Sequence, residues 1–151
     1  ISLGLVGSEM CIRDSSWIWA AAKLGFELVI GAPKPFQPAA AFLKKVKTKH
    51  VRVEENTLKA VAGCDVLYTD VWVSMGKEDE SAERVKLLAN YQIDDALVAA
   101  AKKKAIVMHC LPAYRGKEIT NDVMEDHAGV IFEQAENRLH AQKAVMVKLV
   151  S

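Results

Sequence analysis

The residues best placed to do chemistry in this chain are the neighbouring His109 and Cys110. They end the apolar run 106–108 and Pro112 then turns the backbone away, so the pattern predicts a strand with an imidazole and a thiol at its carboxyl end. In open α/β sheets, ligands bind at that edge. Neighbouring side chains on a strand point to opposite faces, so a Cys-His nucleophilic pair is disfavoured. An isolated pair of this kind is more often a small buried Cys beside a His that bonds the backbone.

A second group of polar residues follows the apolar run 66–69. Asp70 stands at the end of that run, Ser74 lies four residues further on, and Gly76 allows a close approach of the backbone. Asp70 could bind an ammonium group, while Ser74 and nearby N–H groups could bind a carboxylate, which together would recognise an amino acid. The plainer alternative is an Asp that caps the next helix and a Ser that closes a turn.

The third candidate is Arg138, near the start of the last expected helix. Its guanidinium could form a fork of two hydrogen bonds with a carbonyl or phosphate oxygen. An Arg in the first turn of a helix is more often solvated or salt-bridged, so this signal is weak by itself. His127 and His140 lack partners at metal-ligand spacing, and we expect no metal site.

Size and composition fit one ordinary globular domain. The chain has 151 residues, of which 51% are hydrophobic and 26% charged, so it can form a core. Twenty basic and nineteen acidic residues nearly cancel, so we expect no nucleic-acid partner and no membrane partner, but a small bound ligand. Three cysteines at unrelated spacings resemble neither a disulfide framework nor a zinc site, which predicts a cytoplasmic protein. No segment resembles a transmembrane helix or a signal peptide.

Short apolar runs alternate with amphipathic stretches, which predicts an α/β fold: a Rossmann-like three-layer domain with a mostly parallel sheet flanked by helices. The expected strands are 26–30, 50–53, 66–71, 105–109 and 130–133. The expected helices are 16–24, 38–47, 57–62, 82–90, 94–103 and 136–149. Gly25 and Gly63 stand where a helix ends in a left-handed residue, and Asp94 is a plausible N-cap.

Residues 1–15, ISLGLVGSEMCIRDS, resemble a leader that translated metagenomic reads inherit from sequencing adaptors. We therefore expect this segment not to be native sequence. Residues 3–6 can still serve as a first strand, because a sheet asks mainly for apolar, extended residues there. The following residues 7–10 contain no GxGxxG turn, which argues against a nucleotide-binding Rossmann module.

Three segments, in this order, together resemble the ornithine carbamoyltransferases: TDVWVSMG (69–76), MHCLPAYRGKEIT (108–120) and FEQAENRLHAQKAVM (132–146). The resemblance implies that residues 16–151 form that family's C-terminal, ornithine-binding domain, and that the N-terminal carbamoyl-phosphate domain is absent here. It implies that the ornithine-binding residues are Asp70, Ser74 and Met75. It implies that the residues in contact with carbamoyl phosphate or the reacting amine are Cys110, Leu111 and Arg138.

The chemistry of these side chains agrees with the implied reaction, the carbamoylation of ornithine to citrulline. The δ-amine must lose a proton before it can attack the carbamoyl carbon, and a nearby thiolate or carboxylate could assist that loss. Cys110 would steer the δ-amine, and Asp70 would hold the amino-acid end. Arg138 would polarise the carbamoyl oxygen as negative charge grows on it. Cys110 and Arg138 are therefore the expected catalytic residues, with no cofactor.

Other functions stay open at this level. A non-enzymatic α/β module that binds an amino acid or a partner subunit would carry the same fold, and a related carbamoyltransferase could act on another amine. The resemblance implies a homotrimeric parent enzyme that acts on L-ornithine and carbamoyl phosphate. We expect the isolated 151 residues to be an inactive monomer with an exposed apolar face, because catalysis needs both substrates held together.

Overall fold

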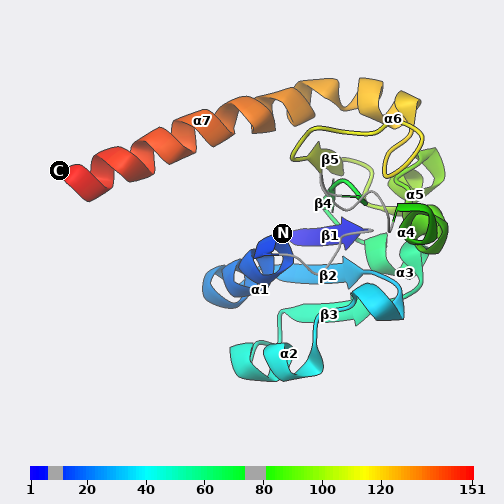
Figure 1. The fold of residues 1–151 in the computed structure, drawn as a ribbon, viewed down its shortest axis with the longest axis horizontal. Helices are drawn as coiled ribbons and strands as arrows, with labels where there is room; N and C mark the ends of the chain where they lie inside the picture. The colour runs from blue at the N-terminus through cyan, green and yellow to red at the C-terminus, as the bar shows by residue number, and fades with distance from the viewer. Residues whose placement is uncertain (7–11, 74–80) are drawn as a thin grey trace.

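A parallel sheet forms the centre of the molecule (Figure 1). The computed structural model describes residues 1–6, 12–73 and 81–151. Within them the sheet has five strands, in the order β3-β2-β1-β4-β5, and every neighbouring pair is parallel. The strands are β1 (Ser2–Val6), β2 (Glu27–Gly31), β3 (Val51–Glu54), β4 (Val66–Thr69) and β5 (Ile106–His109).

Helices connect these strands, as expected where parallel neighbours need crossover connections. The α-helices are α1 (Ile12–Leu24), α2 (Ala40–Val46), α3 (Thr57–Val61), α4 (Ser81–Leu88), α5 (Asp95–Ala100), α6 (Asn121–Asp126) and α7 (Ala128–Val150). The described residues also form the short 3-10 helices η1 (Lys34–Phe36) and η3 (Ala89–Tyr91). The α/β class with a parallel sheet is confirmed.

Two hydrophobic clusters cover the two faces of the sheet, because successive side chains along a strand point in opposite directions. Leu28 and Ile30 of β2 pack in a cluster with Ile18 of α1 and Val46 of α2. Val29, between them in sequence, packs in the other cluster, to which α3, α5, α6 and α7 contribute. Helices on both faces make the three layers that the sequence predicts.

Local signals mark several element boundaries as expected. The Asp94 carboxylate accepts a hydrogen bond from the Leu97 N–H at 2.8 Å, which caps α5. Gly25 and Gly63 have φ of 73° and 74°, the left-handed conformation that glycine adopts without strain. Other boundaries differ: α1 begins at Ile12 rather than residue 16, and α6 was not expected.

The expected strand 130–133 is wrong, because these residues lie in the helix α7. A short apolar run has no period long enough to distinguish a strand from a buried helical turn. Ile131 is fully buried, Gln134 and Ala135 are partly buried, and Phe132 is 56% exposed. Burial at positions i, i+3 and i+4 is helical, since α7 lays this stripe against β5.

The expectation that residues 3–6 can act as a strand is confirmed. β1 lies in the middle of the sheet and pairs with β2 on one side and β4 on the other. Val6 is fully buried, and the Ser2 N–H donates to the Asp65 carboxylate at 2.8 Å. The sheet therefore needs a strand in this place.

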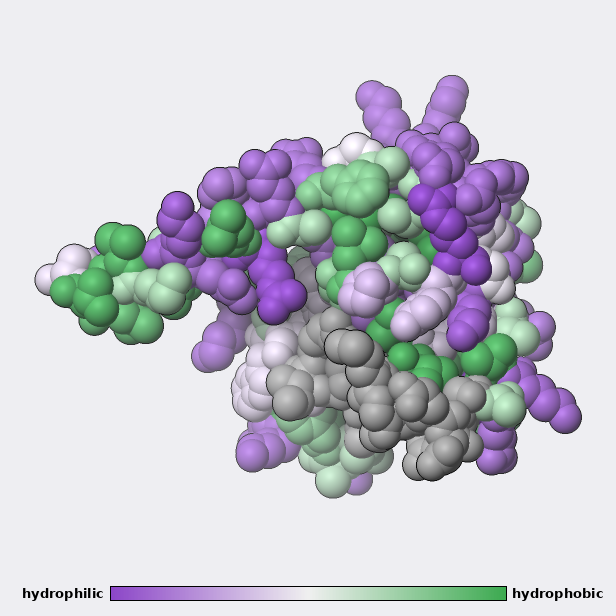
Figure 2. All heavy atoms as spheres, turned by 45° about the horizontal axis from the view of Figure 1, so that its top comes forward, coloured by the Kyte–Doolittle hydropathy of each residue, from purple (hydrophilic) through white to green (hydrophobic). Residues whose placement is uncertain are grey.

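The C-terminal part of α7 extends away from the sheet (Figure 1). Apolar side chains gather at its far end (Figure 2), where Val145, Met146, Leu149 and Val150 are each more than half exposed. The exposed apolar face that we expected is present on this helix. Among the described helices, none combines the length and the apolar character that crossing a membrane requires.

We expect Leu67→Ala to lower the free energy of unfolding by about 2–5 kcal/mol, because it opens a cavity at β4, a strand with a neighbour on each side. Leu67 is fully buried, whereas Leu24, at the end of α1, is 77% exposed. Leu24→Ala is therefore the matched control and should change stability by less than about 0.5 kcal/mol. Urea denaturation followed by circular dichroism measures both; equal losses would contradict this packing.

Candidate active site

The strand order places a ligand-binding edge between β1 and β4. From β1 the chain runs outward through β2 to β3, then returns to the other side of β1 for β4 and β5. The carboxyl ends of strands at such a reversal form a crevice in open α/β sheets. The Thr69 hydroxyl donates to the Val6 carbonyl at 2.9 Å and ties the ends of these two strands together.

Asp70 directly follows β4 at this edge and is 6% exposed. Its Oδ1 accepts a hydrogen bond from its neighbour, the Val71 N–H, at 2.8 Å. The same oxygen accepts from the Cys110 thiol, also at 2.8 Å. A carboxylate from the end of β4 thus meets the thiol that follows β5, although forty positions separate them in the sequence.

His109 and Cys110 point to opposite sides, as strand geometry predicts. Cys110 packs on the cluster that contains Ile18 and Leu28. The His109 ring is fully buried, where its Nδ1 accepts from the Leu111 N–H at 2.9 Å and its Nε2 lies 3.3 Å from Glu118 Oε1. The expectation that these two side chains do not form a nucleophilic pair agrees with this geometry.

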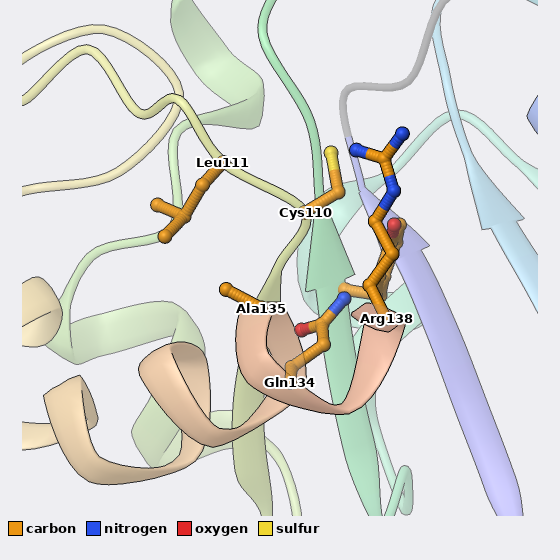
Figure 3. A pocket seen from close by; sticks show the side chains of 6 residues that line it. Cys110, Leu111, Gln134, Ala135 and Arg138 are labelled. Atoms are coloured by element: carbon orange, nitrogen blue, oxygen red, sulfur yellow. The ribbon is translucent and has the colours of Figure 1, made fainter. Parts of the chain in front are cut away.

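A cavity of about 360 Å³ brings Arg138 to the same place. Its lining residues are Tyr68, Cys110, Leu111, Gln134, Ala135 and Arg138. In Figure 3 the Cys110 sulfur and the Arg138 guanidinium lie on the same side of the pocket, one from the turn after β5 and the other from α7. The cavity is therefore lined by a thiol and a guanidinium, and the thiol is hydrogen-bonded to the Asp70 carboxylate.

Three of the lining residues, Tyr68, Gln134 and Ala135, do not follow from the sequence analysis. Tyr68 lies two positions before Asp70 on β4, so strand alternation places the two on one face. Gln134 lies four positions before Arg138, one helical turn away. Because the sequence pattern predicts a strand at residues 130–133 and a helix only from residue 136, it does not place Gln134 on the same helix as Arg138.

The other described cysteine has different surroundings. Cys64 is fully buried, and burial raises the pKa of its thiol, so the reactive thiolate form is disfavoured there. Its sulfur lies 3.7 Å from the Ser2 hydroxyl, at the start of β1. Cys110, which is partly exposed, is the thiol that faces the cavity.

Two residues of the expected ornithine-binding set, Ser74 and Met75, lie outside the described residues. The other sequence-predicted residues of the site, apart from Asp70, line the cavity: Cys110, Leu111 and Arg138. Asp70 joins them through the Cys110 thiol. Within the described ranges, no group of three His, Cys, Asp or Glu side chains is arranged to hold a metal ion.

Residues 1–149 match the protein family described as aspartate/ornithine carbamoyltransferase, Asp/Orn binding domain. The chain belongs to this family. It is 48% identical over 139 residues to an ornithine carbamoyltransferase of Campylobacter fetus, covering 88% of this chain and 45% of that protein. An ornithine carbamoyltransferase of Akkermansia muciniphila is 48% identical over 149 residues, which are 99% of this chain and 49% of that protein.

Solved structures of the carbamoyltransferase family share this fold. The anabolic ornithine carbamoyltransferase of Campylobacter jejuni superposes with a TM-score of 0.85 at 38% identity, over 98% of this chain and 50% of that one. The ornithine carbamoyltransferase of Pyrococcus furiosus gives a TM-score of 0.81 at 38% identity, over 96% of this chain and 47% of that one. The chain thus spans about half the length of the curated relatives it matches.

Proposed function

We propose that this carbamoyltransferase-family chain is the ornithine-binding part of an ornithine carbamoyltransferase. The reaction moves the carbamoyl group of carbamoyl phosphate to the δ-amine of L-ornithine and yields L-citrulline and phosphate. The observation that carries the proposal is the contact between the Cys110 thiol and the Asp70 carboxylate, beside a cavity that Arg138 lines. The relatives reported above are named ornithine carbamoyltransferases, which supports it.

The thiol-carboxylate pair can accept the proton that the δ-amine must lose. The Cys110 S–H donates to Asp70 Oδ1, and Cys110 lines the cavity, so an amine bound there lies next to the sulfur. A proton can pass from the amine to sulfur while the thiol proton passes to the carboxylate, and the amine keeps its electron pair for attack. In this mechanism Asp70 acts at the reacting end of ornithine, and not at the amino-acid end as the sequence predicts, because its carboxylate contacts the Cys110 thiol.

Arg138 acts on the other reactant. When the nitrogen lone pair forms a bond to the carbamoyl carbon, the electrons of the C=O bond move to oxygen, and a guanidinium stabilises that charge. The C=O bond then re-forms, the bond from carbon to the phosphate oxygen breaks, and phosphate leaves with that electron pair and takes the second proton that the attacking nitrogen loses. We propose Cys110 and Leu111 as further contacts of carbamoyl phosphate, and Ser74 and Met75 as further contacts of ornithine.

Charge distinguishes ornithine from aspartate, the other amino acid in the family's description. The side-chain carboxylate of a bound aspartate would lie close to the Asp70 carboxylate, with the Cys110 thiol between them. Two negative charges this close repel each other. The side chain of ornithine ends in an amine, which the same carboxylate attracts. The cavity therefore favours a diamino acid.

The proposal includes the setting of the whole protein. We propose that residues 16–151 form the C-terminal, ornithine-binding domain of a homotrimeric cytoplasmic enzyme, whose other half binds carbamoyl phosphate. Because proximity catalysis needs both substrates fixed in one site, the 151 residues alone should produce no citrulline.

A chimera tests the function directly. Residues 1–151, which keep the central strand β1, are joined to the N-terminal half of the Campylobacter fetus relative, and citrulline is assayed with L-ornithine and carbamoyl phosphate. We expect turnover with ornithine and none with aspartate. The unjoined chain is the control for catalysis, and calorimetry with ornithine on that chain tests a non-enzymatic binding module. Saturable binding there without turnover by the chimera would contradict the proposal.

A further inference from the structure

A buried polar chain lies behind the cavity, on the face of the sheet that the proposed mechanism does not use. The side chains of His109 and Glu118 are both fully buried. Glu118 Oε1 accepts from the Tyr114 N–H at 2.5 Å and lies 3.3 Å from His109 Nε2. His109 Nδ1 accepts from the Leu111 N–H at 2.9 Å. Two of these contacts, through His109, connect the carboxylate to the Leu111 N–H, and the third connects it to the Tyr114 N–H.

The hydrogen bonds determine the histidine tautomer. Because Leu111 N–H is a donor, the His109 Nδ1 that faces it has no proton. The ring proton is then on Nε2, where it is donated to Glu118. The Glu118 carboxylate accepts the Nε2 proton, and this leaves His109 Nδ1 as the acceptor for the Leu111 N–H.

Glu118 is itself held in place by the body of the protein. Its carbonyl accepts from the Ile93 N–H at 2.9 Å, and the Ile93 carbonyl accepts from the Thr120 N–H at 3.0 Å. Ile93 and Ile119 are fully buried in the cluster under α5 and α7. The carboxylate therefore has a rigid support that does not depend on the loop it bonds.

Leu111 needs such support, because its φ of 53° lies in the left-handed region, which is unfavourable for a residue other than glycine. We propose that Glu118 and His109 are positioning residues: they hold Leu111 in this conformation and so keep the Cys110 thiol on Asp70 and at the cavity. This inference rests on the proposed carbamoyl transfer only for its consequence in catalysis.

A pair of variants at one position separates hydrogen bonding from packing. Glu118→Gln keeps an acceptor for His109 and Tyr114, whereas Glu118→Met has a similar length and no such acceptor. His109→Leu breaks the same chain at its next member. All variants also carry Cys11→Ser, so that peptide mapping follows Cys110 and Cys64 only.

The first measurement is the rate at which iodoacetamide modifies each cysteine in the 151-residue chain. We expect Glu118→Met and His109→Leu to raise the Cys110 rate roughly tenfold, the factor that the loss of one hydrogen bond allows, and Glu118→Gln to leave it unchanged. Cys64, buried on the sheet, reports global unfolding and should stay protected. An unchanged Cys110 rate would overturn the inference. An equal rise in the Cys64 rate in Glu118→Met and His109→Leu would also overturn it, since Glu118 and His109 would then stabilise the whole fold rather than the Cys110–Leu111 turn.

The second measurement uses the chimera described above. We expect Glu118→Met to lower kcat by on the order of 10²-fold, the effect of displacing a reacting group by about 1 Å, while KM for ornithine changes little. Glu118→Gln should restore kcat. A chimera that is inactive without substitutions contradicts the proposed function alone, and the cysteine rates still decide the positioning role. An active chimera whose kcat is the same with Glu118→Met overturns that role.

Discussion

Asp70→Asn should lower kcat for citrulline formation by roughly 10³-fold in the chimera, because the amide cannot accept the proton that a carboxylate takes from the thiol. The Asn side chain still offers an oxygen at the position of Oδ1, 2.8 Å from the Cys110 sulfur, so the geometry of the site is retained. The loss therefore reports proton transfer rather than shape. Steady-state kinetics with ornithine as the varied substrate measures it.

A matched aspartate provides the control for this variant. Asp95 is exposed in the first turn of α5 and is not among the residues that line the cavity, so Asp95→Asn should leave kcat unchanged. A Cys110→Ala variant should lose activity as Asp70→Asn does, and the double variant should lose little more, because residues that act as one unit are not additive. A kcat within tenfold of the parent for Asp70→Asn would contradict the proposed relay.

Arg138→Met should lower kcat by about 10²–10³-fold, since it removes the cation that stabilises the carbamoyl oxygen in the transition state. Arg138 is exposed, so the same substitution should leave the free energy of unfolding within about 0.5 kcal/mol of the parent. A large effect on rate with none on stability is the signature of a residue that acts on substrate. Citrulline assays and urea denaturation on the same samples measure both.

Two further variants distinguish the fork of a guanidinium from simple positive charge. Arg138→Lys keeps the charge without the planar pair of donors and should recover only part of the activity. Lys143→Met removes an exposed cation from the same helix, α7, away from the residues that line the cavity, and should have no effect. Equal losses for Arg138→Met and Lys143→Met would show that α7 contributes only its overall charge.

Local sequence patterns were sufficient to locate most of the strands and several helix ends. The apolar runs that became β2, β3, β4 and β5 were found within one or two residues of their bounds. The carboxylate of Asp94 and the positive φ of Gly25 and Gly63 act within one turn of the backbone, so their effect can be read from neighbouring letters.

The strand predicted at residues 130–133, near the start of α7, was wrong for a physical reason. In residues 130–133 the apolar side chains are consecutive, and consecutive apolar residues fit a fully buried strand as well as the buried turn of a helix. The helix is selected by packing, because it places Ile131, Gln134 and Ala135 together against β5. That selection depends on a partner surface from another part of the chain.

Glu118 shows the same limit within the candidate site. A glutamate in a polar loop is most often exposed, so nothing in the letters around it predicts complete burial. Its burial follows from the backbone bond between Ile93 and Glu118, which joins segments twenty-five positions apart. Only the folded chain reveals the support behind the Cys110–Leu111 turn.

The sequence by itself determined the chemical groups and their place at strand ends, because a run of apolar residues followed by a polar one is a local feature of the chain. It also determined that His109 and Cys110 face opposite sides, since alternation along a strand is a property of the backbone. Only the tertiary structure decided that Asp70 meets Cys110 and that Arg138 shares their cavity. These contacts depend on the order of β4 and β5 in the sheet and on where α7 packs against it. Both are determined by long-range packing rather than by neighbouring residues.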